Sequence, residues 1–120
     1  MRDRPDGAQL LALARELEEI APRLPPEERV DPALLARARA IAGREREAGD
    51  APLAACREAL IALYGPGDLA DLFERLAREI RAGTYDAAGA ERDRVCRVLW
   101  AVTLQKLRES NPEYLAASAR

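Results

Sequence analysis

Residues 69–81 read LADLFERLAREIR and have the most regular pattern in the chain. Their apolar and charged side chains separate onto opposite sides when the residues are placed about 100° apart, as in an α-helix. The apolar positions are Leu69, Leu72, Phe73, Leu76 and Ile80, and the charged positions opposite them are Glu74, Arg75, Arg78 and Arg81. The pattern predicts an amphipathic helix that begins after Asp68 and ends near Gly83.

Apolar side chains recur every three or four residues along most of the 120 residues, so the chain is predicted to be all-α. Proline and glycine divide it into about five helices, and Asp6 with Gln9 is expected to form a capping box at the first. The helices are expected at residues 6–21, 31–49, 50–64, 68–83 and 87–110, followed by a short turn with Tyr114 and Leu115. We expect a single domain over residues 1–120, folded as one compact bundle with a long, largely buried C-terminal helix.

The composition excludes several classes of function. The chain has no histidine, which rules out Ser-His-Asp and Cys-His nucleophiles and imidazole metal ligands. Its 19 basic and 21 acidic residues are interleaved and give a net charge of -2, unlike the basic patch of a nucleic-acid-binding protein. We therefore expect no nucleic-acid partner, no bound metal, no cofactor and no catalytic residue.

Nothing in the sequence predicts contact with a membrane. There is no run of 18 apolar residues, and the first residues, MRDRPDGAQLL, lack the apolar segment of a secretory signal. Cys56 and Cys96 are too far apart for a CxxC motif and are interpreted as two thiols in a reducing compartment. The protein is predicted to be cytoplasmic.

Three charged residues project into apolar stripes of the expected helices: Glu45, Arg57 and Lys106, which is the only lysine. A charge on a packed face is costly unless it is paired, hydrogen-bonded or able to reach water. The favoured interpretation is structural, with Glu45 paired to Arg57 or Lys106, or with side chains that extend to solvent near the helix ends. The alternative is a site where the three converge and bind an anionic metabolite. A catalytic role for Lys106 is a third hypothesis.

The last expected helix is apolar over about 240° of its circumference, more than one packed face requires. Besides the side of Val95, the arc includes Cys96, Trp100, Leu104 and Leu107. Either the helix runs through the middle of the bundle, or these four residues form an interface, since tryptophan is favoured in interfaces. The simplest partner is a second copy, which would make a homodimer.

Three segments resemble a bacterial family of small, uncharacterised helical domains: AIAGRERE at 40–47, LFERLAREIRAGTYD at 72–86 and TLQKLRESNPEYL at 103–115. The likeness extends from Leu10 to Leu115. Members of that family are often encoded beside aminoglycoside-phosphotransferase-like kinases and acyl-CoA dehydrogenases, so the resemblance implies a partner of that kind. The matching positions are Arg44, Glu45, Lys106, Asn111, Pro112, Tyr114 and Leu115, whereas Arg37 stands where the family pattern has asparagine.

These observations predict a helical accessory or protein-interaction module rather than an enzyme. Its expected interface consists of Cys96, Trp100, Leu104 and Leu107. The alternative is a protein that binds an anionic metabolite through Glu45, Arg57 and Lys106. The resemblance adds Arg44, Asn111 and Tyr114 to those candidate binding residues.

Overall fold

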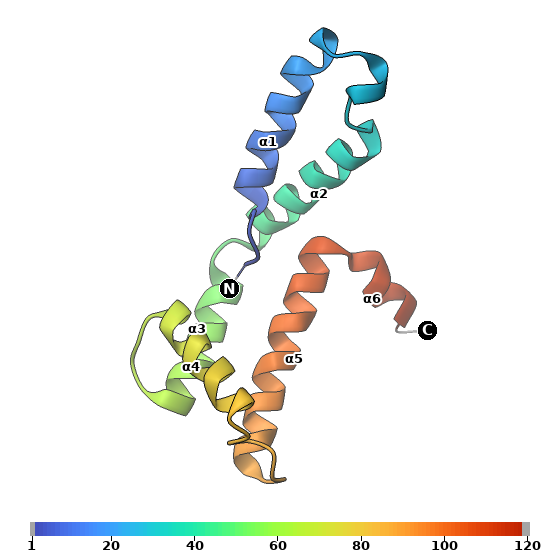
Figure 1. Ribbon diagram of the computed structural model, residues 1–120. Coiled ribbons are helices and arrows are strands. Elements are labelled where there is room, and N and C mark those ends of the chain that lie inside the picture. The colour runs from blue at the N-terminus through green and yellow to red at the C-terminus, as the bar shows by residue number, and fades with distance from the viewer. Residues whose placement is uncertain (1, 119–120) are drawn as a thin grey trace. The chain divides into compact units, whose positions relative to one another are not determined.

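The computed structural model describes residues 2–118, and that part of the chain consists of helices and connecting turns without a strand (Figure 1). Its α-helices are α1 (Gly7–Ile20), α2 (Pro32–Ala48), α3 (Ala51–Tyr64), α4 (Leu69–Arg81), α5 (Ala90–Ser110) and α6 (Pro112–Ser118), with short 3-10 turns at Ala21–Arg23 and Pro26–Glu28. The all-α prediction is confirmed. The number of helices exceeds the expected five because the segment from Pro112 is a helix and not only a turn.

The helix ends follow the sequence signals closely. Asp6 accepts a hydrogen bond from the Gln9 amide (2.9 Å), and the Gln9 side chain accepts one from the Asp6 amide (2.8 Å), so the predicted capping box is confirmed. Asp31 caps α2 by accepting from the Ala33 amide over 2.9 Å. Gly65, where α3 ends, has a φ of 88°, a left-handed conformation that glycine adopts without a steric penalty.

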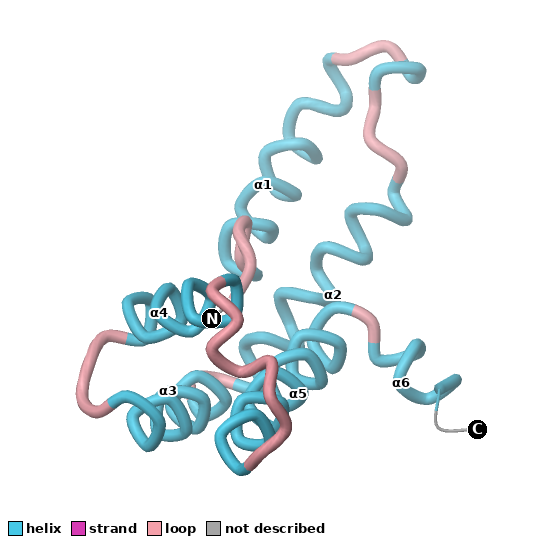
Figure 2. The backbone as a smooth tube through the Cα atoms, turned by 60° about the horizontal axis from the view of Figure 1, so that its bottom comes forward, coloured by secondary structure: helices cyan, strands magenta, loops and turns pink. Residues whose placement is uncertain are grey.

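The helices form two compact units. The first unit, Arg2–Gly49, contains α1 and α2, and the second begins at Asp50 and contains α3 to α6. Figure 2 marks the loops between the helices of each unit, such as residues 65–68 between α3 and α4. The prediction of one domain over residues 1–120 stays a prediction.

In the first unit, α1 and α2 form an antiparallel hairpin (Figure 1). Its buried residues are small: Gly7 and Ala14 of α1 and Ala42 of α2. A Cβ atom on Gly7 would lie 2.9 Å from the Cα atom of Ala42, so the two backbones approach closely there. Further along the hairpin, Glu18 and Arg39 form an ion pair between the helices.

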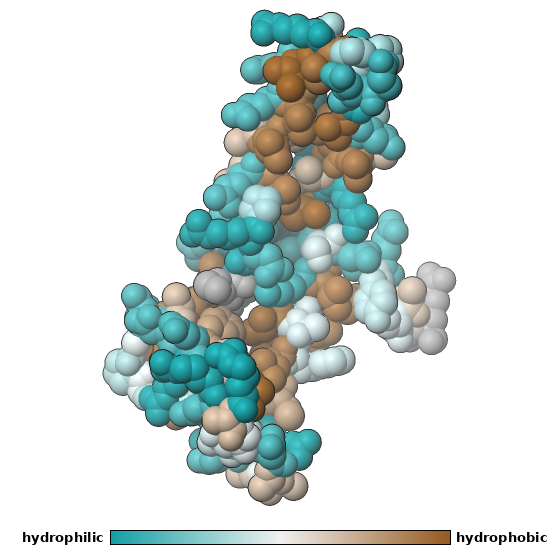
Figure 3. All heavy atoms as spheres, viewed as in Figure 1, coloured by the Kyte–Doolittle hydropathy of each residue, from teal (hydrophilic) through white to brown (hydrophobic). Residues whose placement is uncertain are grey.

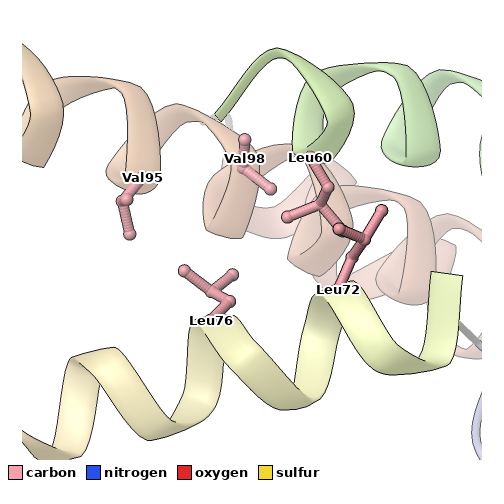
Figure 4. Close-up of a cluster of buried hydrophobic side chains, with 5 residues drawn as sticks. All are labelled: Leu60, Leu72, Leu76, Val95 and Val98. Carbon is pink, nitrogen blue, oxygen red and sulfur yellow. The ribbon is translucent and has the colours of Figure 1, made fainter. Parts of the chain in front are cut away.

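In the second unit, α3 packs against α4 and α5 around a cluster of buried side chains (Figure 4). The cluster consists of Leu60 from α3, Leu72 and Leu76 from α4, and Val95 and Val98 from α5. Leu69 and Phe73 are partly buried against it, whereas Ile80 remains 40% exposed. The amphipathic pattern of residues 69–81 therefore predicted the packed side of α4 correctly.

Helix α5 matches the expected buried C-terminal helix only in part. Val95 and Val98 lie in the core, but Leu99 is 40% exposed and Trp100 is 67% exposed. The reason is geometric, since residues 95 and 98 share one side of a helix, and residue 100 lies on the other side. Burial of α5 is therefore deepest on the side of Val95 and Val98.

Candidate functional site

Glu45 lies near the C-terminal end of α2, and its side chain is 15% exposed. Its carboxylate accepts a hydrogen bond from the Gly7 amide, 2.5 Å away in the first turn of α1, and lies 3.8 Å from Arg2 Nε. The Arg2 guanidinium also donates to the Gly49 carbonyl over 2.7 Å, just beyond α2. A carboxylate is stabilised at a helix N-terminus and a cation at a helix C-terminus. The charge in the apolar stripe of α2 therefore stabilises the hairpin itself.

Arg57 and Lys106 lie in the second unit, whereas Glu45 lies in the first. Arg57 is exposed, and its Nε donates to the Gly67 carbonyl, 3.3 Å away in the loop after α3. Lys106 is half-buried on α5, where its carbonyl accepts a hydrogen bond from the Ser110 hydroxyl over 2.7 Å. The convergence of the three charges stays a prediction.

The candidate residues taken from the resemblance also fall in different units. Asn111 ends α5, as predicted, and its Oδ1 accepts a hydrogen bond from the Tyr114 amide over 3.3 Å. Tyr114, in α6, is 57% exposed. Arg44 is half-buried on α2 in the first unit. The structure thus brings Asn111 and Tyr114 together at the end of α5.

A chain of polar side chains that the sequence analysis did not identify connects the end of α3 to α4 and to the turn after it. The Tyr85 hydroxyl donates to the Glu79 carboxylate over 2.5 Å, and the Tyr64 and Tyr85 hydroxyls lie 2.6 Å apart. Arg75 donates to Glu79 over 3.3 Å, and its guanidinium lies 4.4 Å from the centre of the Tyr64 ring. Arg75 and Glu79 are four residues apart on α4, but no regular spacing relates them to Tyr64, so only the tertiary structure reveals the whole network.

The network shifts the acidity of its members. The hydrogen bond from Tyr85 lowers the pKa of Glu79, because it stabilises the ionised carboxylate. Desolvation raises the pKa of Tyr64 and of Tyr85, and the nearby Glu79 adds to both shifts. Both tyrosines are therefore kept neutral and act as hydrogen-bond donors.

Glu109 is the buried acid of α5, with a relative exposure of 6%. The Gln105 side chain donates to its carboxylate over 3.0 Å. The projection that singled out Lys106 also places Glu109 on the side of Val95 and Val98. The spacing of the sequence could therefore have identified Glu109 as an acid on the packed side of α5.

The other side of α5 carries the apolar residues expected at an interface, which we call the outer stripe. It consists of Cys96, Trp100, Leu104 and Leu107. Cys96 is an exposed free thiol, Leu104 and Leu107 are half-buried, and Trp100 is the most exposed of the large hydrophobic side chains. By contrast, Cys56 packs against the core, and desolvation raises the pKa of its thiol.

A sequence family described as a domain of unknown function, DUF6285, matches residues 22–114. The chain belongs to this family. The DUF6285 match includes the whole outer stripe and most of both units, but it begins after α1. It agrees with the resemblance to uncharacterised helical domains, whereas the kinase and acyl-CoA dehydrogenase neighbours stay predictions. No curated protein and no solved structure matches the chain.

Two further features concern residues 2–118 alone. None of their helices combines the length and the apolar character that crossing a bilayer requires. Their cysteine, aspartate and glutamate side chains form no group of three that could hold a metal ion.

Proposed function

We propose that this DUF6285 protein is a non-enzymatic accessory module that self-associates and also docks on a second protein. The docking surface is the outer stripe of α5. The exposure of Trp100 carries this proposal. Its side chain is 67% exposed, on a helix whose opposite side carries the buried Val95 and Val98. Scattered apolar residues are normal on protein surfaces, but a tryptophan within an apolar stripe is typical of the centre of an interface.

The charges beside the outer stripe favour a partner of a different kind over a second copy. With residues about 100° apart, Arg92, Arg97 and Arg108 border the stripe, and Asp93 is the acid beside it. Two copies of this surface would bring arginines together, which opposes association. A complementary partner would have an apolar groove with carboxylates along its edges. Self-association would then use another surface.

The resemblance described above suggests the class of that partner. It associates such domains with aminoglycoside-phosphotransferase-like kinases and with acyl-CoA dehydrogenases. We therefore expect the outer stripe to dock on a kinase-like or acyl-CoA-metabolising protein. Genomic association is an indirect argument, so the proposal depends on the surface itself.

Binding of an anionic metabolite by Glu45, Arg57 and Lys106 receives less support from the geometry. The Glu45 carboxylate already accepts from the Gly7 amide within the first unit, and Arg57 is exposed with its Nε directed to a loop carbonyl. Docking through α5 uses residues that lie together on one helix. It is therefore the stronger proposal.

The test compares tagged wild-type protein with Trp100→Ala and Leu104→Glu in pull-downs from the source cells. Ala101→Glu is the matched control, because it adds the same charge to α5 on an exposed position away from the stripe. We expect both stripe variants to release a partner that wild type and Ala101→Glu retain, with helicity by circular dichroism unchanged. Equal retention of that partner by all four proteins would refute the proposal.

A further inference from the structure

The hairpin of α1 and α2 has a continuous apolar side of its own, which we call the hairpin face. It consists of Leu13, Leu17 and Ile20 of α1 and Leu34, Ala38 and Ile41 of α2. Leu13 is 48% exposed, Ile20 is 41% exposed and Leu34 is 59% exposed. Figure 3 shows the apolar atoms of α1 and α2 as a brown band along the hairpin.

The hairpin face is distinct from the surface by which the two helices contact each other. That contact uses Gly7 and Ala14 of α1 and Ala42 of α2, all of them buried. At about 100° per residue, the residues of the hairpin face lie roughly a quarter turn around each helix from the residues that contact the other helix. In an antiparallel pair, both rotations lead to the same side of the hairpin. The two helices therefore present one shared apolar surface.

A two-helix unit with so few buried residues needs further burial. Its buried residues are Gly7, Ala14 and Ala42, which contribute little apolar area, and below about 70 residues a single core rarely stabilises a fold by more than a few kcal/mol.

The charges at the two outer edges of the hairpin face differ in sign. Glu16 lies at the α1 edge and Arg37 at the α2 edge, and both are exposed. The contacts of Glu18 with Arg39 and of Gly7 with Glu45 set the antiparallel register. In this register, Glu16 and Arg37 lie at about the same height along the hairpin.

Two symmetric arrangements can bring two such faces together. A two-fold axis across the helices stacks α1 on α1 and brings like charges together. A two-fold axis along the helices stacks α1 on α2 of the second copy, so that all neighbouring helices are antiparallel. This arrangement places each Glu16 beside Arg37 of the other copy. Charge complementarity selects the second arrangement.

We propose that the hairpin face is the dimerisation surface, and that two copies form an antiparallel four-helix bundle with Glu16 of each copy against Arg37 of the other. This inference rests on the self-association in the proposed function and assigns its surface. It leaves the outer stripe of α5 to the second protein. The leucines and isoleucines of both copies form the core of this bundle.

The test uses full-length chains with reversed charges, Glu16→Arg and Arg37→Glu, and measures mass and dimer affinity by sedimentation equilibrium. In each variant alone, two like-charged contacts replace two attractive ones, so we expect the dimer to be weakened about tenfold. In an equimolar mixture, a mixed dimer places the two arginines of the Glu16→Arg chain against the two glutamates of the Arg37→Glu chain. We therefore expect the mixture to dimerise as well as wild type.

Glu47→Arg is the matched control, because it makes the same charge change on an exposed residue of α2 turned away from the face. It should dimerise as wild type does. Circular dichroism checks that every variant remains helical. A wild-type mass of 13.2 kDa at all concentrations would refute both self-association and this inference. A dimer that the charge reversals weaken no more than Glu47→Arg, or that the mixture fails to restore, would refute only the inference.

Discussion

The carboxylate of Glu45 accepts a hydrogen bond from the Gly7 amide across 2.5 Å, and so connects the last turns of α2 to the first turn of α1. Glu45 and Gly7 are 38 residues apart in sequence. The contact places a negative charge at a helix N-terminus, where unpaired amides and the helix dipole stabilise it. It also explains an acid inside the apolar stripe of α2 without a ligand.

Glu45→Gln should destabilise the protein by about 1–2 kcal/mol, because the side chain keeps an acceptor but loses its charge beside Gly7 and Arg2. Glu47→Gln, on the exposed neighbouring acid, should change stability by less than about 0.5 kcal/mol. Urea unfolding at one fixed protein concentration measures both variants. Equal stability of the two would show that the Glu45 contact contributes nothing.

Gly7→Ala should destabilise the chain by about 1–3 kcal/mol, although alanine favours helix formation. Its Cβ atom would lie 2.5 Å from Glu45 Oε2 and 2.9 Å from the Cα atom of Ala42. Gly43→Ala is the control, because a Cβ atom there meets nothing within 4 Å. This substitution, inside α2, should stabilise by about 0.5–1 kcal/mol. Thermal unfolding midpoints that move in the same direction for both variants would contradict the close approach.

Tyr85→Phe should destabilise the second unit by about 1 kcal/mol at pH 7, because Glu79 loses its hydroxyl donor. Since that hydrogen bond lowers the pKa of Glu79 in the folded state, its contribution is present above the ordinary carboxyl pKa of 4.5. It is lost as pH falls through the lowered folded value. The stability difference from wild type should therefore shrink between pH 6 and pH 3.

Urea unfolding at several pH values measures that difference. Tyr114→Phe, on the exposed tyrosine of α6, serves as the control and should show little effect at any pH. A difference between wild type and Tyr85→Phe that stays constant down to pH 3 would show that Glu79 does not titrate within this network.

Cys96 should react with a thiol reagent at least about tenfold faster than Cys56, because it is exposed on the outer stripe. Cys56 is half-buried against the core, and desolvation raises the pKa of its thiol. Single variants Cys56→Ser and Cys96→Ser assign the two rates. If Cys56 reacts first, the packing of α3 differs from that described.

The sequence predicted those features of the fold that local chemistry controls. The capping box at Asp6, the packed side of residues 69–81 and the end of α5 at Asn111 all agree with the structure. In each case the decisive atoms lie within a few turns of one another. Side-chain spacing and glycine or proline breaks therefore contain the necessary information.

Tertiary contacts set the limits of that prediction. The spacing showed that Glu45 lies on an apolar stripe, but not that Gly7 would come close enough to supply a partner. It showed a wide apolar arc on α5, but not that α3 and α4 would cover only the side of Val95 and Val98. The hydrogen bond between Tyr64 and Tyr85 depends on the packing of α3 against α4, which no periodicity records.

The account predicts two surfaces with two occupants, and a native mass spectrum of tagged protein from its own cells tests both at once. Wild type should give a dimer of the 13.2 kDa chain together with a second polypeptide. Leu104→Glu should lose the second polypeptide and keep the dimer, whereas Glu16→Arg should weaken the dimer. A bare monomer, or a second polypeptide that Leu104→Glu retains in full, would contradict the account.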